Sequence, residues 1–214
     1  MTNTASVQTG NIWDLDFVAP HPTQDTDLLS QLNFVPGLKE ILMLRQVHAL
    51  EHATVWVLGE RQGSATNPPE LEDNNLGGLS TDQGFYLYGQ VNMSNLQKAV
   101  PIALRRLTRG EWNLAVHPRC GTNLSVGMFL TATLALGAHL LLPRGPIEQI
   151  LGLGLAATAA TQLAPDLGSL AQRYLTTAIP FNLAIEDITS TADIWGRPSH
   201  FVQVRWKNSR LGDF

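Results

Sequence analysis

The stretch Leu124-Ser-Val-Gly-Met-Phe-Leu-Thr-Ala-Thr-Leu-Ala-Leu-Gly-Ala-His-Leu-Leu-Leu142 contains no formally charged residue. A helix crosses a hydrocarbon core with roughly 20 apolar residues, and this run has about that length. A second uncharged run lies between Glu148 and Asp166 and is rich in Gly, Ala and Thr. Such small residues let two helices approach closely. The two runs, joined at Pro143-Arg144-Gly145-Pro146, therefore predict a transmembrane helical hairpin that contacts membrane lipid.

The alternative to this hairpin is a pair of buried helices in a soluble core, because the mean hydropathy of the whole chain is near zero. The arginines around the two runs predict an orientation. The turn has only Arg144, whereas the flanks carry Arg105, Arg106, Arg109, Arg119 and Arg173. By the positive-inside rule, we expect an integral protein of the plasma or thylakoid membrane with both termini on the cytoplasmic side.

The composition of the 214 residues is poor in charge, with 44% hydrophobic and 15% charged residues, against roughly 25% charged in a typical soluble domain. The formal net charge is −4. Because there is no basic cluster with interleaved aromatic residues, we expect no nucleic-acid partner. The single cysteine excludes an internal disulfide.

The segment His48-Ala-Leu-Glu51-His52 has the pattern H-x-x-E-H, the inverse of the zinc-binding motif H-E-x-x-H. Positions i, i+3 and i+4 share one face of a helix, so both imidazoles can reach one ion beside the carboxylate. A second cluster, His117-Pro-Arg-Cys120-Gly-Thr-Asn, adds another imidazole and the thiol. The candidate ligands of a zinc or other divalent transition-metal ion are therefore His48, His52, His117 and Cys120, with Glu51 as candidate general base.

Two simpler interpretations of these clusters stay open. Helical histidines often bond a carboxylate one turn away without any metal. The Cys120 thiol is expected near a helix N-terminus, where the helix dipole lowers its pKa and favours metal binding, but a lone buried cysteine is more often inert.

Both clusters also resemble the motifs of a known family. His48 to His52, then His117-Pro-Arg-Cys-Gly-Thr122, then a long apolar helix and Tyr174-Leu-Thr-Thr177, are similar in order and spacing to an uncharacterised family of bacterial membrane proteins described as metal-dependent enzymes. The chain resembles a branch of it found in oxygenic photosynthetic bacteria. The resemblance covers roughly residues 44–177 and implies metal binding at these motifs.

The chain departs from that family pattern, H-G-A-E-H-K, at three positions, where Ala49, Leu50 and Ala53 replace glycine, alanine and lysine. The absent lysine removes a cation that could stabilise an anionic intermediate. Metal binding is therefore a safer expectation than catalysis.

The expected fold is mainly α with a few short strands, in which a motif helix and a small α+β part are joined to the transmembrane hairpin. The expected parts are an N-terminal arm (1–35), the metal-site region (36–122), the hairpin with its following helix (123–177) and a C-terminal docking segment (178–214). The first expected element is a helix from Pro36 that ends near Gly59, followed by a polar loop over 62–82. A strand is expected over 84–91, and then a helix that is capped by Ser94 and broken or kinked at Pro101. An extended piece over 114–116 and a strand over 201–206 complete the expected elements.

Three functions fit these features. In the first, which we favour, a membrane-associated hydrolase holds the ion with His48, His52 and His117, leaves a fourth position open and uses Glu51 as base. In the second, a non-catalytic metal- or tetrapyrrole-binding protein closes the coordination shell with Cys120. In the third, the chain is an accessory subunit or assembly factor of a photosynthetic membrane complex. No motif identifies the substrate.

Overall fold

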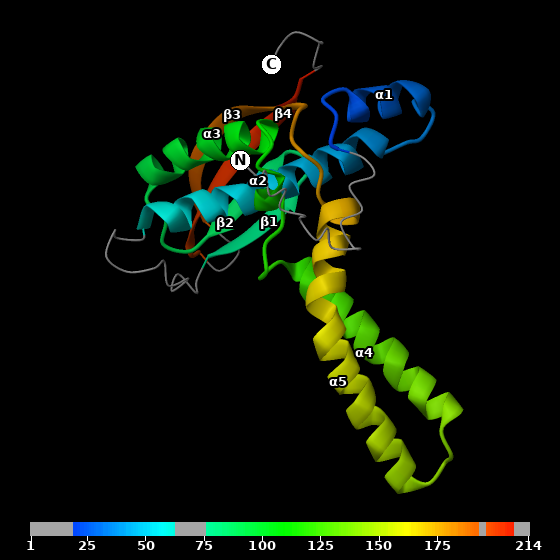
Figure 1. Ribbon diagram of the computed structural model, residues 1–214. Coiled ribbons are helices and arrows are strands. Elements are labelled where there is room, and N and C mark those ends of the chain that lie inside the picture. The colour runs from blue at the N-terminus through cyan, green and yellow to red at the C-terminus, as the bar shows by residue number, and fades with distance from the viewer. Residues whose placement is uncertain (1–18, 63–75, 193–195, 208–214) are drawn as a thin grey trace, which may run out of the picture.

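The computed structural model describes residues 19–62, 76–192 and 196–207. The described chain forms a small α+β part from which a long helical hairpin projects (Figure 1). The elements in chain order are α1 Gln24–Gln31, α2 Leu38–Gln62, β1 Gly77–Thr81, β2 Gly84–Tyr88, α3 Met93–Thr108, the 3-10 turn η1 Trp112–Ala115, α4 Gly121–Leu141, α5 Pro146–Ala171, the π-helical turn η2 Gln172–Thr176, β3 Leu183–Ala192 and β4 Pro198–Trp206.

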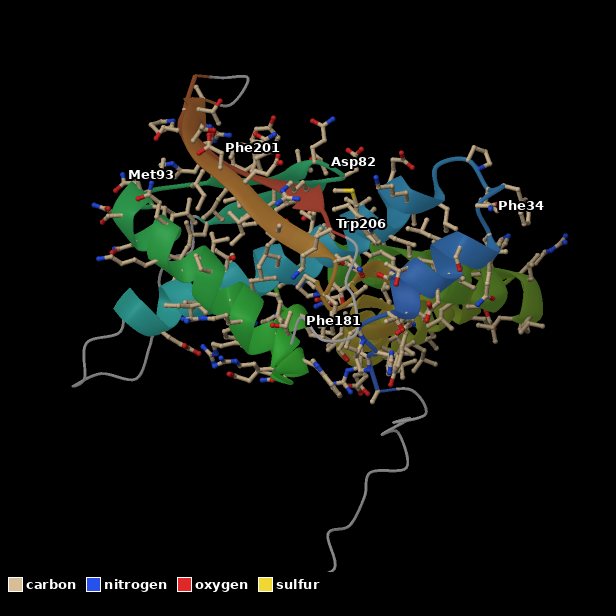
Figure 2. All side chains as sticks on the ribbon, turned by 90° about the horizontal axis from the view of Figure 1, so that it is seen from above. Phe34, Asp82, Met93, Phe181, Phe201 and Trp206 are labelled. Carbon is tan, nitrogen blue, oxygen red and sulfur yellow. The ribbon has the colours of Figure 1, made fainter. Side chains whose placement is uncertain are left out.

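The four strands form one antiparallel sheet in the order β1-β2-β4-β3. Seen from above, α2 and α3 lie along one side of this sheet (Figure 2). Alternation along the strands explains the packing, because Phe85 and Leu87 of β2 and Val202 of β4 are buried under the helices. On the outer face, the rings of Tyr86 and Phe201 pack against each other at 4.5 Å.

The hairpin consists of α4 and α5, whose 21 and 26 residues give lengths of about 31 and 39 Å. No residue of α4 is buried, and the buried residues of α5 are small and spaced by multiples of four: Gly152, Ala156, Ala160 and Gly168. The large apolar side chains therefore point outward, among them Leu124, Met128, Phe129, Leu136, Leu140, Ile147, Ile150 and Leu155. A soluble core helix would hide such residues.

The open end of the hairpin is joined to α2 by hydrogen bonds to carbonyl groups in η2 and directly after it. Arg45 donates from Nη2 to the carbonyls of Tyr174 and Thr177, at 3.1 and 3.0 Å. His48 donates from Nδ1 to the carbonyl of Thr176 at 3.1 Å. The last carbonyls of a helix are commonly bonded by groups from outside it, and these two side chains of α2 have that role here.

Several sequence-based expectations are confirmed. The described chain is mostly helical with a small sheet, α4 and α5 form the expected helical hairpin, and both are long and apolar enough to cross a membrane. The strands expected over 84–91 and 201–206 correspond to β2 and β4. The proposed division into four parts stays a prediction.

Other expectations are wrong in detail. Helix α2 continues past Gly59 to Gln62, and the loop expected over 62–82 contains strand β1, because Gly77 to Thr81 pair with β2. Residues 63–75 of that loop, and 1–18 of the N-terminal arm, lie outside the described residues. Within the described part of the arm, α1 forms a helix.

The segments around α3 and α4 also differ from expectation. Asn92, rather than Ser94, caps α3, because its side chain accepts the Ser94 amide at 2.9 Å, and α3 passes through Pro101 without ending. The segment over 114–116 lies partly in η1 rather than being extended throughout. Cys120 was expected near the N-terminus of a helix and is itself the N-cap of α4.

The close approach of the two hairpin helices leads to a prediction about Gly168. A Cβ at this position would overlap the Asn123 side chain and lie 3.1 Å from the Asn123 Cα, whereas a Cβ at Gly154 would meet nothing within 4 Å. We expect Gly168→Ala to destabilise the protein by about 1–3 kcal/mol, as overpacking does, and Gly154→Ala to leave stability unchanged or slightly raised. Thermal unfolding in detergent measures the midpoint of each variant. Equal midpoints for the two variants would contradict the close contact between Gly168 and Asn123.

Candidate metal centre

Helix α2 presents His48, Glu51 and His52 on one face, as their spacing predicted. The opposite side of the helix is anchored in the core, where Val47, Leu50 and Ala53 are fully buried. This burial fixes the rotation of α2, because turning the helix would expose those apolar residues. The orientation of the three polar side chains is therefore a consequence of the core.

The segment from η1 to α4 brings the thiol to the same place. Pro118 follows His117 and disfavours helical geometry there, so the chain turns before α4 begins. Cys120 then caps α4, accepting the Thr122 amide at Sγ over 3.4 Å. In this position Sγ lies 3.3 Å from Nε2 of His48.

The two imidazoles of α2 have the same hydrogen-bonding arrangement. His48 donates from Nδ1 to the Thr176 carbonyl at 3.1 Å, and His52 donates from Nδ1 to the Ala115 carbonyl at 2.7 Å. A carbonyl can only accept, so each neutral ring carries its proton on Nδ1 and has an unprotonated Nε2. Metal-ligating histidines show the same outer hydrogen bond, which fixes ring orientation and tautomer.

Three side chains form a group that could hold a metal ion, namely His48, His52 and Cys120, whose ligand atoms all lie within 4.8 Å of one another. Zinc bonds of about 2.0–2.1 Å to nitrogen and 2.3 Å to sulfur at tetrahedral angles place the ligand atoms about 3.3–3.6 Å apart. To bind an ion, the ligand atoms would therefore have to move closer to one another by about 1 Å. Two imidazoles and a thiolate suit zinc and other borderline or soft ions.

His117 lies beside this group but is not a member of it. Its ring centroid is 5.8 Å from that of His52 and 5.1 Å from that of Trp56. The Nδ1 atom accepts the Arg119 amide at 3.3 Å, which leaves the proton of the neutral ring on Nε2. Burial, His52 and Arg119 lower the pKa of His117 to about 4, so the ring is neutral at pH 7. As a ligand it would first have to exchange tautomers.

Glu51 lies next to the group with its carboxylate held by the sheet. It is 8% exposed and accepts a hydrogen bond from Ser80 of β1 at 2.5 Å. Gly78 of the same strand makes room for it, because a Cβ there would overlap the carboxylate. Burial raises the pKa of Glu51, partly opposed by the hydrogen bond from Ser80 and by His48.

The pKa of the Cys120 thiol is shifted in the opposite direction to that of Glu51. Burial raises its pKa, but the neighbouring His52 and the amide of Thr122 outweigh this and hold the pKa below its usual value. Position at a helix N-terminus acts in the same direction, because the unpaired amides there favour an anion.

These side chains line a cavity of about 550 Å³, together with Arg45 and several apolar residues. This volume lies within the range of small-molecule sites. A second cavity, about 650 Å³, also includes Arg45 but is lined by Asp25, Trp112, Arg173 and other residues, and by none of the predicted ligands.

Sequence reasoning missed three residues that support the site. Ser80 holds Glu51, and the Thr176 carbonyl holds His48. Gln172 is fully buried, accepts the His117 amide at 2.8 Å and donates to Asn123 at 2.7 Å, so it joins the ligand segment to the hairpin. Thr176 lies in the stretch Tyr174 to Thr177 that carried the family resemblance, whereas nothing in the sequence singles out Ser80 or Gln172.

Comparisons with known proteins agree with a family from photosynthetic bacteria. A family model described as a domain of unknown function (DUF6391) matches residues 43–188, a range that includes every candidate site residue. A protein of the cyanobacterium Picosynechococcus sp., described as uncharacterized, is 53% identical over 201 residues, which are 92% of this chain and 97% of that protein. No solved structure matches the chain. Neither description names a metal or an activity.

The contact between Gly78 and Glu51 yields a prediction about the strand. Gly78→Ala should destabilise the protein by about 1–3 kcal/mol, because the added methyl group displaces a buried carboxylate from Ser80. Gly77→Ala is the matched control, since its Cβ would lie no closer than 3.9 Å to Tyr88. A double-mutant cycle of thermal unfolding with Glu51→Ala tests the cause. If Gly78→Ala lowers the free energy of unfolding by the same amount in the Glu51→Ala background, a contact other than that with Glu51 is responsible.

Proposed function

Since the chain belongs to the family of unknown function DUF6391, whose description names no activity, we propose from the site alone that it is a membrane-anchored, divalent-metal-dependent hydrolase with its metal centre at the membrane surface. The single observation that carries this proposal is the convergence of His48, His52 and Cys120 at the open end of the hairpin, with Glu51 beside them.

Membrane anchoring is supported by the outward-facing apolar side chains of α4 and α5. The one ionisable residue of α4 is His139, which bonds Gln149 near the turn. The length of α4, about 31 Å, matches a hydrocarbon core. Because Cys120 caps α4 and Thr176 ends η2, the metal centre would then lie at the level where both helices leave the bilayer.

A catalytic centre is supported by the number of ligands. Three protein ligands leave one tetrahedral position for a substrate or water, as in catalytic zinc sites, whereas structural sites have four. Zinc, or a similar ion, would act as a Lewis acid towards water and a carbonyl group. His48, His52 and Cys120 would hold it, and the carbonyls of Thr176 and Ala115 would keep the two imidazoles in the correct tautomer.

In this proposal, Glu51 accepts the proton of the attacking water. It lines the same cavity as the three ligands, and Ser80 binds one of its oxygens, Oε2. This leaves Oε1 available for a second partner. Glu51 can then return the proton to the leaving group, the usual sequence for a general base in hydrolysis.

A non-catalytic metal-binding protein is the second candidate, and the position of His117 favours it. His117 lines the same cavity, and a change of tautomer would let it fill the fourth position and close the shell. Binding in an accessory subunit or assembly factor would require no role for Glu51. The two candidates therefore differ in what Glu51 does.

The membrane proposal predicts that alkaline carbonate leaves the protein in the membrane pellet. The lone cysteine offers a topology test with membrane-impermeant maleimide. In a Cys120→Ser background, we expect Arg144→Cys to be labelled only from the non-cytoplasmic side, and Arg109→Cys only from the cytoplasmic side. Release as a soluble monomer without detergent would overturn membrane insertion, and labelling of both from one side would overturn the hairpin topology.

The metal proposal predicts different effects for ligands and base. We expect His52→Ala and Cys120→Ser to lower zinc affinity by more than about a hundredfold, since even loss of an outer hydrogen-bond partner costs about 10–100-fold. Glu51→Gln should retain the ion but reduce hydrolysis of acyl esters about 10²–10⁴-fold. Metal content, measured on protein purified in mild detergent without added metal, and ester turnover are the two readouts.

The control for these variants is His139→Ala, which removes an exposed imidazole on the hairpin and should change neither readout. Equal metal loss in Glu51→Gln and His52→Ala would contradict the general-base role and favour the binding protein. Absence of bound metal in the unaltered protein, even after titration with zinc, would overturn the proposal.

A further inference from the structure

The face of α2 that carries the metal centre is apolar at its N-terminal end. Ile41 and Leu44 precede His48 by seven and four positions, so all three lie on the same side of the helix. The side chains of Ile41 and Leu44 both line the cavity of the metal centre, yet they are 54% and 40% exposed. Apolar side chains that both line the cavity and reach solvent lie at its mouth.

The third member of this mouth comes from the hairpin. Leu175 lies in η2, lines the same cavity and is 71% exposed. We refer to Ile41, Leu44 and Leu175 as the apolar lip. Helix α2 crosses the open end of the hairpin (Figure 1), where Arg45 and His48 bond carbonyls of η2. Leu175 belongs to the same turn η2, so the lip adjoins the end of the hairpin. In the first turn of α4, Leu124 is likewise exposed, at 68%.

The cavity thus combines the candidate ligands and Glu51 with apolar side chains, of which the three of the lip are exposed and adjoin the end of the hairpin. A water-soluble substrate would gain nothing from such a mouth. An amphiphile matches both parts, because its polar group can reach the ligands while its alkyl chain covers the lip and enters the bilayer.

We propose that the substrates of this site are membrane-resident amphiphiles, namely esters or amides with a long acyl chain that leaves the cavity over Ile41, Leu44 and Leu175. This inference rests on the proposed function. In the reaction, water forms a bond to the acyl carbon and the bond from that carbon to the leaving oxygen or nitrogen breaks. Glu51 transfers the water proton to the leaving group, and no oxidant or reductant is needed.

The experiment uses alkyl hydroxamates, which chelate an ion through their polar end and carry a chain of chosen length. The full-length protein, in bilayer nanodiscs, is loaded with cobalt, and binding is followed by the change in cobalt absorption. We compare acetohydroxamate with decanohydroxamate. The unaltered protein is compared with Leu44→Ser, Leu175→Ser and the control Phe34→Ser, which removes an equally apolar side chain that is 74% exposed and outside the cavity.

All four proteins should bind acetohydroxamate equally. Decanohydroxamate should bind about tenfold more weakly to Leu44→Ser and to Leu175→Ser than to the unaltered protein or Phe34→Ser, since each buried methylene contributes about fourfold in affinity. Partition of the probe into the bilayer is the same for every variant and does not affect this comparison. Two lip variants on separate elements guard against misfolding of either one.

The outcomes separate the two proposals. If cobalt and acetohydroxamate bind but decanohydroxamate shows no dependence on the lip residues, the amphiphile inference is overturned while the metal centre stands. If cobalt does not bind to the unaltered protein, the proposed function is overturned and the inference with it.

Discussion

The structure depends on the hydrogen bonds that α2 makes to backbone carbonyls at the end of the hairpin. Arg45 and His48 bond the carbonyls of Tyr174 and Thr176 in η2 and of Thr177 directly after it. The backbone contributes as well, since the Ala178 amide donates to the Arg45 carbonyl at 3.0 Å. These bonds attach a hairpin with little polar surface to the α+β part, and one of them sets the tautomer of a candidate metal ligand.

The same attachment explains why the candidate centre lies between the two parts of the molecule. His52 is bonded to the Ala115 carbonyl in η1, Cys120 begins α4, and Gln172 at the end of α5 holds the His117 amide. Displacing the hairpin would therefore change the position of the thiol relative to the imidazoles. The attachment of the hairpin to the α+β part and the geometry of the candidate ligands are therefore coupled, since Cys120 both caps α4 and lies beside His48.

Much of the fold could be predicted because its signals are local. Two uncharged runs of suitable length, the second rich in small residues, and a proline turn between them predict α4 and α5. Strand-forming residues bounded by turn signals predict β2, and alternation predicts β4. The strand β1 was missed because Gly77 and Gly78 have weak strand preference and pair only through the partner strand. Cys120 was expected beside a cap rather than as the cap, since thiols are uncommon in that role.

The sequence by itself determined that His48, Glu51 and His52 share a helical face, because this follows from helical periodicity. It also determined that two helices are long and apolar enough to cross a membrane, because this follows from the length of the uncharged runs. Only the tertiary structure decided that Cys120 joins the two imidazoles while His117 lies beside them, and that Ser80 and Gly78 hold the carboxylate. These contacts join residues 27 to 72 positions apart. Their geometry depends on packing between separate elements, which no local pattern specifies.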